Sequence, residues 1–101
     1  MEPEAPRSSA SLQLTQQGKE LLERGYVDDA ISVLERSVGL DPANGQNYYY
    51  LSEAWLEKGN IVQAEEFNRL ADLYLKDDPV WGWRTAEQRS RLRALQEWPR
   101  D

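Results

Sequence analysis

The chain has 101 residues, of which 40% are apolar and 30% charged, and its formal net charge is −6. A chain of this length can build one folded core but not two. It contains neither cysteine nor histidine, which excludes thiolate nucleophiles, disulfides, imidazole bases and the usual zinc ligands. Its negative charge argues against nonspecific binding to nucleic acid, which depends on Lys and Arg.

The first ten residues are rich in Pro, Ser, Ala and Glu and lack the apolar stretch of a signal peptide. We expect residues 1–10 to form a disordered N-terminal linker. Because no run of about 18 apolar residues occurs, the sequence predicts a soluble chain that is not inserted in a membrane. The absence of cysteine leaves the compartment open between cytoplasm and periplasm.

Residues recur at a fixed interval along the chain. Gly25 and Gly59 lie 34 positions apart (59 minus 25). The same interval relates three further identical pairs: Leu22 and Leu56, Glu23 and Glu57, Ala30 and Ala64. A period of this length is typical of stacked helical hairpins, in which each unit contacts only its neighbours.

The first unit is predicted to contain two helices. The first spans about residues 11–24, with Leu14, Gln17, Gly18 and Leu21 on one face. Gly25 ends it, because glycine adopts a left-handed cap at little cost.

The second helix of this unit spans about residues 28–40. Asp28 and Asp29 suit its positive N-terminus, and Pro42 ends it. Its expected buried residues are Ala30, Val33, Leu34 and Val38.

The second unit repeats this plan. Its first helix is expected over about residues 45–58, with Asn44 as N-cap and Gly59 as the stop. Its second helix spans about residues 61–76, and Asn60 and Gln63 have the spacing of a capping box. The expected buried residues of the two helices are Tyr48, Leu51, Ser52 and Trp55, then Ala64, Phe67, Ala71 and Tyr74.

A fifth helix is predicted over about residues 80–98. Trp81, Gln88, Leu92 and Leu95 are spaced along one stripe of it. Residues 80–101 contain five arginines against three acidic residues, a balance of +2, which leaves −8 for the rest of the chain. A helix with one apolar stripe and a charged outer face is what caps a repeat stack.

These residues resemble the tetratricopeptide repeat family over about residues 11–79, and the last helix resembles the family's capping helix. The first unit meets the family pattern at Leu14, Gly18, Leu21, residues 25–31, Leu34 and residues 40–42. The second unit meets it at Tyr48, Leu51, Ser52, Trp55, residues 59–64, Ala71 and the late Pro79.

The resemblance implies an all-α fold, a right-handed stack of antiparallel helical hairpins with five helices. The implied domain covers residues 11–98, with repeat 1 at about 11–44, repeat 2 at about 45–79 and the capping helix at about 80–98. Gln17 and Asn68 stand where large apolar residues are usual, so we expect a looser core there. Pro79 comes three residues late, which leaves the orientation of the last helix open.

The resemblance also implies that the first helix of each hairpin lines a concave groove, which holds a peptide or helix of a partner protein. The groove candidates carried over are Leu12, Thr15, Gln16, Lys19, Leu22, Glu23, Gln46, Tyr49, Tyr50, Glu53, Leu56 and Glu57. Family members that bind a chaperone's terminal carboxylate use groove Lys and Asn residues, of which only Lys19 remains here. The acidic groove favours a partner with Lys or Arg among apolar residues.

The groove tyrosines and the C-terminal arginines also have possible roles that involve no partner protein. Tyr49 and Tyr50 could pack on the last helix or on a second copy of the chain, and the C-terminal arginines could be solvated, with Glu87 and Arg91 spaced as an ion pair.

The sequence therefore predicts a non-catalytic protein-interaction module with no cofactor and no metal site. Acidic neighbours such as Asp77 and Asp78 diverge rather than converge on a substrate. One alternative is a structural unit that forms a homodimer or stacks within a larger repeat protein, because two hairpins are few for independent stability. Another is that the arginine-bearing last helix docks on an anionic surface such as a membrane or nucleic acid.

Overall fold

A computed structural model describes the backbone of residues 4–97 and the side chains of residues 7–97. Within that range the chain forms five helices and no strand. They are α1 (Glu4–Glu23), α2 (Val27–Leu40), α3 (Gly45–Glu57), α4 (Ile61–Leu75) and α5 (Trp81–Gln96). The predicted all-α repeat fold is confirmed.

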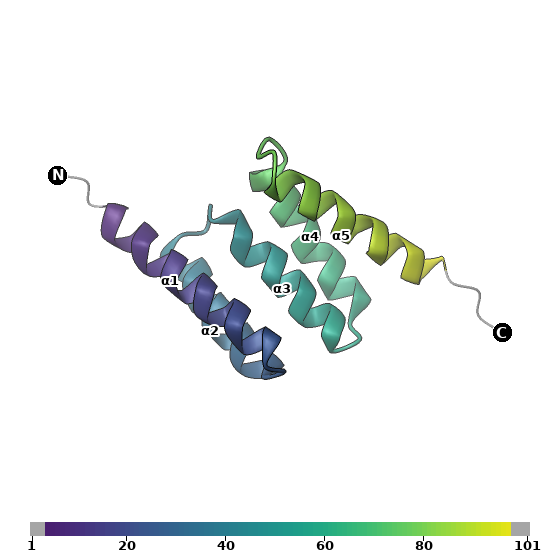
Figure 1. Ribbon diagram of the computed structural model, residues 1–101, viewed down its shortest axis with the longest axis horizontal. Coiled ribbons are helices and arrows are strands. Elements are labelled where there is room, and N and C mark those ends of the chain that lie inside the picture. The colour runs from purple at the N-terminus through teal and green to yellow at the C-terminus, as the bar shows by residue number, and fades with distance from the viewer. Residues whose placement is uncertain (1–3, 98–101) are drawn as a thin grey trace.

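The helices stack in chain order. Helix α2 packs against α1 and α3, and α4 packs against α3 and α5. Figure 1 shows α1, α3 and α5, from purple to yellow, following one another across the molecule in the same direction. The first helices of the two hairpins and the last helix therefore lie along one side of the stack.

Both predicted glycine stops are confirmed. Gly25 and Gly59 adopt left-handed φ angles of 87° and 80°. After α1, the Tyr26 amide donates to the Leu21 carbonyl at 2.9 Å and the Gly25 amide to the Leu22 carbonyl at 3.0 Å, and the same pair of bonds follows α3. These bonds satisfy the last carbonyls of each helix, which fixes the turn into the next one.

The two expected asparagine caps differ. The Asn60 side chain accepts a hydrogen bond from the Gln63 amide at 3.0 Å, which caps α4 as predicted. Asn44 occupies the N-cap position of α3, but its side chain makes no capping bond. Its amide instead donates to the hydroxyls of Ser11 and Thr15, at 3.0 and 3.1 Å. Asn44 thus ties the second repeat to the first.

Helix α1 begins seven residues earlier than expected. Residues 4–10 are helical, so the prediction of a disordered linker is wrong for them, while residues 1–3 lie outside the described part. The Arg7 guanidinium donates to the Leu40 and Gly39 carbonyls at 3.2 and 3.3 Å, at the end of α2. Carbonyls at a helix end otherwise lack partners, so this contact gives the added turn of α1 a place to dock.

The buried face of α1 is polar rather than apolar. Gln17, expected in the core, is exposed, whereas Ser11 and Thr15 are buried. The Ser11 and Ser37 hydroxyls lie 2.8 Å apart, and the Thr15 hydroxyl lies 2.6 Å from Oδ1 of Asn47. Because each group finds a partner inside the protein, this layer joins α1, α2 and α3 without the cost of unpaired buried polar atoms.

The apolar core lies mainly between α2, α3 and α4. Its buried members are Ile31, Leu34, Tyr48, Leu51, Ala54, Ala71 and Leu75, and Phe67, Trp55 and Trp81 pack against them. Two residues expected in the core, Tyr74 and Leu95, are 44% and 43% exposed. Trp98, at the expected end of the last helix, lies outside the described residues.

Candidate functional site

A groove of about 440 Å³ opens between α1, α3 and α5. Seven of the twelve groove candidates line it, together with one residue from the last helix: Lys19, Leu22, Glu23, Tyr49, Tyr50, Glu53, Glu57 and Arg84. The lining residues come from α1, α3 and α5, which follow one another across the molecule (Figure 1). The stacking of hairpins thus brings together side chains that are far apart in the sequence.

An aromatic cluster forms one side of this groove. The rings of Tyr49 and Tyr50 meet edge-on with their centroids 5.2 Å apart, and Trp81 lies edge-on to both, at 5.4 and 5.8 Å. The Arg84 guanidinium lies 4.7 Å from the Trp81 ring centroid, in a cation–π contact. Such edge-on pairs hold the rings in defined positions, so the groove presents a preformed aromatic surface.

Burial raises the pKa of Tyr49 and Tyr50 above the ordinary value, and the nearby Glu53 carboxylate raises both further, while Arg84 opposes the change. A phenol is protonated at neutral pH even at its ordinary pKa, and the raised pKa of these two tyrosines extends that state to more alkaline pH. Both tyrosines therefore keep a hydroxyl donor beside an apolar ring, a combination that suits interfaces.

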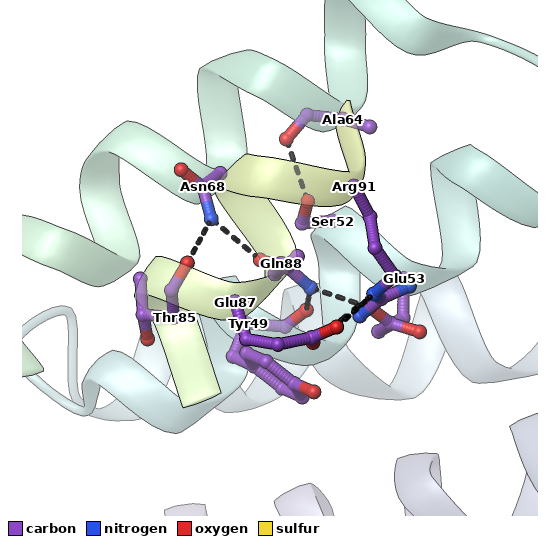
Figure 2. A network of polar contacts seen from close by, with 9 residues as sticks. All are labelled: Tyr49, Ser52, Glu53, Ala64, Asn68, Thr85, Glu87, Gln88 and Arg91. Carbon is purple, nitrogen blue, oxygen red and sulfur yellow. Dashed lines mark hydrogen bonds and ion pairs between the residues drawn. The ribbon is translucent and has the colours of Figure 1, made fainter. Parts of the chain in front are cut away.

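The last helix is attached through hydrogen bonds rather than through a large apolar seam (Figure 2). Asn68 of α4 donates to the Gln88 side chain at 2.8 Å and to the Thr85 carbonyl at 3.0 Å. Gln88 in turn donates to the Tyr49 carbonyl at 3.1 Å and to the Glu53 carboxylate at 2.7 Å. The expectation of a loose core at Asn68 is wrong, because the buried amide is paired with α5.

Glu53 is already paired within the protein. The Arg91 guanidinium contacts it at 2.8 Å and also contacts Glu87 at 3.1 Å, as Figure 2 shows. Burial alone would lower the pKa of Arg91, but the hydrogen bonds and charges of Glu53 and Glu87 raise it. One of the three groove acids expected to attract a basic partner is thus neutralised by α5.

A family model for the tetratricopeptide repeat matches residues 21–82. The chain belongs to the tetratricopeptide repeat family. No curated protein and no solved structure matches the chain. Tetratricopeptide repeats are generally protein-interaction modules and typically non-catalytic scaffolds. No helix within residues 4–97 is long and apolar enough to cross a membrane, and no group of metal-binding side chains occurs in that range.

Five groove candidates of this tetratricopeptide chain lie outside the groove lining. Thr15 is 3% exposed and belongs to the polar layer between α1, α2 and α3, so its assignment to the groove is wrong. Leu12 and Gln16 are exposed nearer the N-terminus of α1, and Gln46 and Leu56 are partly buried in α3. The groove therefore uses the last turns of α1 rather than its whole face.

Arg84 is the lining residue that the sequence prediction missed. It stands 34 positions after Tyr50 (84 minus 50), so the repeat interval marks it as a groove position of a third unit. The prediction missed Arg84 because it carried groove positions over only from the first helix of each of the two hairpins.

The charges of the groove are more balanced than predicted. The lining contains Arg84 and Lys19 as well as Glu23 and Glu57, while Glu53 is paired with Arg91. Within residues 7–97 neither Glu23 nor Glu57 takes part in an ion pair. These two carboxylates, each in the last turn of its helix, are the acidic groups that a ligand can reach.

Proposed function

We propose that the groove between α1, α3 and α5 binds a segment of a partner protein that carries Lys or Arg among apolar residues. The observation that carries this proposal is the aromatic surface of Tyr49 and Tyr50 beside the accessible carboxylates of Glu23 and Glu57. Tyrosine is enriched where proteins meet, since it offers a large contact area for little lost entropy. The carboxylates select a basic residue beside the apolar contact.

The groove residues provide the test. The full chain is immobilised, partners are captured from a lysate of the source cells, and the bound proteins are compared between the native chain and Tyr50→Ala. Loss of a captured protein from Tyr50→Ala supports the proposal, provided that circular dichroism shows unchanged helix content. Tyr26→Ala is the matched control, because Tyr26 is 57% exposed and lies outside the groove lining. Equal capture by all three chains would contradict the proposal.

Charge reversal tests the chemistry of the partner. Glu23→Lys and Glu57→Lys should each weaken binding of the captured partner by about two- to fivefold, the range for an exposed ion pair. Glu35→Lys makes the same charge change on an exposed position of α2, outside the groove. If Glu35→Lys weakened binding as much, the effect would come from net charge and not from the groove.

A second candidate function is a structural one, in which the chain stacks on copies of itself or on further repeats. It is supported by the exposed apolar side chains of Val80 and Trp83 near the start of α5, which are 58% and 69% exposed. Light scattering over a range of concentrations tests it. A mass that stays at one chain throughout would exclude self-association.

A further inference from the structure

In each of the two repeats, the second helix covers one particular position of the first helix. The equivalent position on α5, which stands where the first helix of a third repeat would be, is open. Gly18, Ser52 and Ala86 follow one another at the 34-residue interval. A Cβ on Gly18 would lie 2.6 Å from Leu34 of α2, and the Ser52 hydroxyl donates to the Ala64 carbonyl of α4 at 2.7 Å. Ala86 is exposed. The flank of α5 that corresponds to these helix–helix contacts is therefore uncovered among the described residues.

A second groove, of about 400 Å³, runs between α4 and α5 at this flank. Its lining residues are Glu65, Asn68, Arg69, Arg89, Leu92 and Arg93. On α5, Trp83 lies three positions before Ala86, so the two share one face of the helix. Trp83 is 69% exposed. The open flank of α5 beside this groove thus carries apolar surface, as a docking surface for a helix requires.

The charges in this second groove are predominantly basic. Three arginines line it against one glutamate. Arg69 contacts Glu66 at 2.6 Å and Arg89 contacts Asp72 at 2.8 Å, both within the protein. Arg93 takes part in no ion pair within residues 7–97. An incoming carboxylate therefore finds an available guanidinium on α5.

The geometry points to an acidic amphipathic helix of a partner protein as the occupant of the open flank of α5 beside the α4–α5 groove, packed as the second helix of a third repeat. A helix covers the equivalent position in both complete units, Trp83 and Ala86 offer it apolar contacts, and Arg93 attracts an acidic side chain. This surface is separate from the first groove, because Arg84 and Arg91 of α5 point to that side while Arg89 and Arg93 line this one.

The chain supplies a suitable probe. Residues 61–75 are a second-helix sequence with three acidic residues and one arginine, and their helix packs on Ser52, which carries a Cβ as Ala86 does. An acetylated and amidated peptide of these residues is titrated into the full ¹⁵N-labelled chain. Saturable changes in NMR chemical shift should appear at the amides of Ala86, Arg89 and Arg93. The peptide is too short to be a stable helix alone, so it should gain helicity on binding.

Matched variants locate the contact. Arg93→Glu should weaken peptide binding by about fivefold, the upper range for one exposed ion pair. Arg84→Glu makes the same charge change on the other side of α5 and should leave the affinity unchanged. Ala86→Tyr should block the flank, whereas Leu95→Tyr, at an exposed position on the opposite side of α5, should not.

Three results would overturn the inference. The first is an absence of saturable shifts at millimolar peptide, and the second is a set of shifts centred on Tyr49 and Tyr50. The third is self-association of the unlabelled chain that Arg93→Glu abolishes, since a second copy would then be the occupant. Tyr50→Ala keeps this test independent of the proposed function, because that variant should lose the groove partner and still bind the peptide.

Discussion

Two glycines determine where the hairpins turn. Gly25 and Gly59 adopt positive φ angles, and a Cβ added at either would meet no atom within 4 Å. The cost of a side chain there comes from the backbone alone. We expect Gly59→Ala to lower the free energy of unfolding by about 1–2 kcal/mol, measured by urea denaturation.

Gly39 is the matched control for this substitution. It lies in the last turn of α2, and a Cβ there also meets no atom within 4 Å, but its φ is not positive. Gly39→Ala should therefore raise the free energy of unfolding by about 0.4–1 kcal/mol. If both substitutions changed stability in the same direction, the left-handed turn would not be what requires glycine.

The groove tyrosines make the folded state less stable at strongly alkaline pH. Burial raises the pKa of Tyr50 above its ordinary 10.0, so the folded state holds the phenolic proton more tightly than the unfolded state does. This contribution to the free energy of unfolding is fully present below about pH 10 and is lost as the pH rises through the pKa of Tyr50 in the folded state. Tyr50→Phe should reduce the loss of stability above pH 10, measured by urea unfolding at each pH with tyrosinate absorbance as the titration signal.

Single residues also show what the sequence could and could not reveal. The glycine stops were predictable, since one residue type satisfies a positive φ at little cost. The burial of Thr15 was not, because its partner Asn47 is 32 positions away and comes close only when the repeats stack. A polar residue on a helix face has no sequence signal that tells a groove contact from a buried hydrogen bond.

Buried hydrogen bonds hold helix α5 against α4, and substitutions can remove them one at a time. Asn68 is 2% exposed and donates to Gln88 and Thr85. Asn68→Leu restores the family's usual apolar residue but leaves the buried Gln88 side-chain oxygen without its donor, so we expect it to lower the free energy of unfolding by about 2 kcal/mol. Urea denaturation measures this change.

A double variant checks the explanation. Asn68→Leu combined with Gln88→Leu removes both members of the pair, so part of the lost stability should return. Simple addition of the two single losses would show that Asn68 and Gln88 are not coupled.

The element boundaries were predictable within one or two residues wherever a glycine, an asparagine cap or a proline marks them, as at Gly59 and Asn60. The start of α1 was not, because its first turn docks on α2 through Arg7 and the Leu40 carbonyl, which no local pattern encodes. The placement of α5 depends similarly on Asp78, whose carboxylate accepts from the Val80 and Trp81 amides at 2.9 and 2.8 Å.

Across the whole molecule the stack is uneven in how much apolar surface each helix buries. Helix α3 contacts α1, α2 and α4, whereas α5 buries Thr85, Gln88 and a single large apolar residue, Leu92. Segments with few buried apolar contacts open locally before the whole chain unfolds. Native-state hydrogen exchange should therefore show weaker protection in α5 than in α3, and equal protection in both would contradict this.

The position of Trp81 has a practical consequence. Its indole touches both tyrosines of the first groove and carries the Arg84 guanidinium against its face. A molecule that displaces Arg84 or presses on either phenol must alter the surroundings of that indole. The protein therefore contains its own fluorophore at the proposed contact surface, and occupancy could be followed by emission without attaching a label.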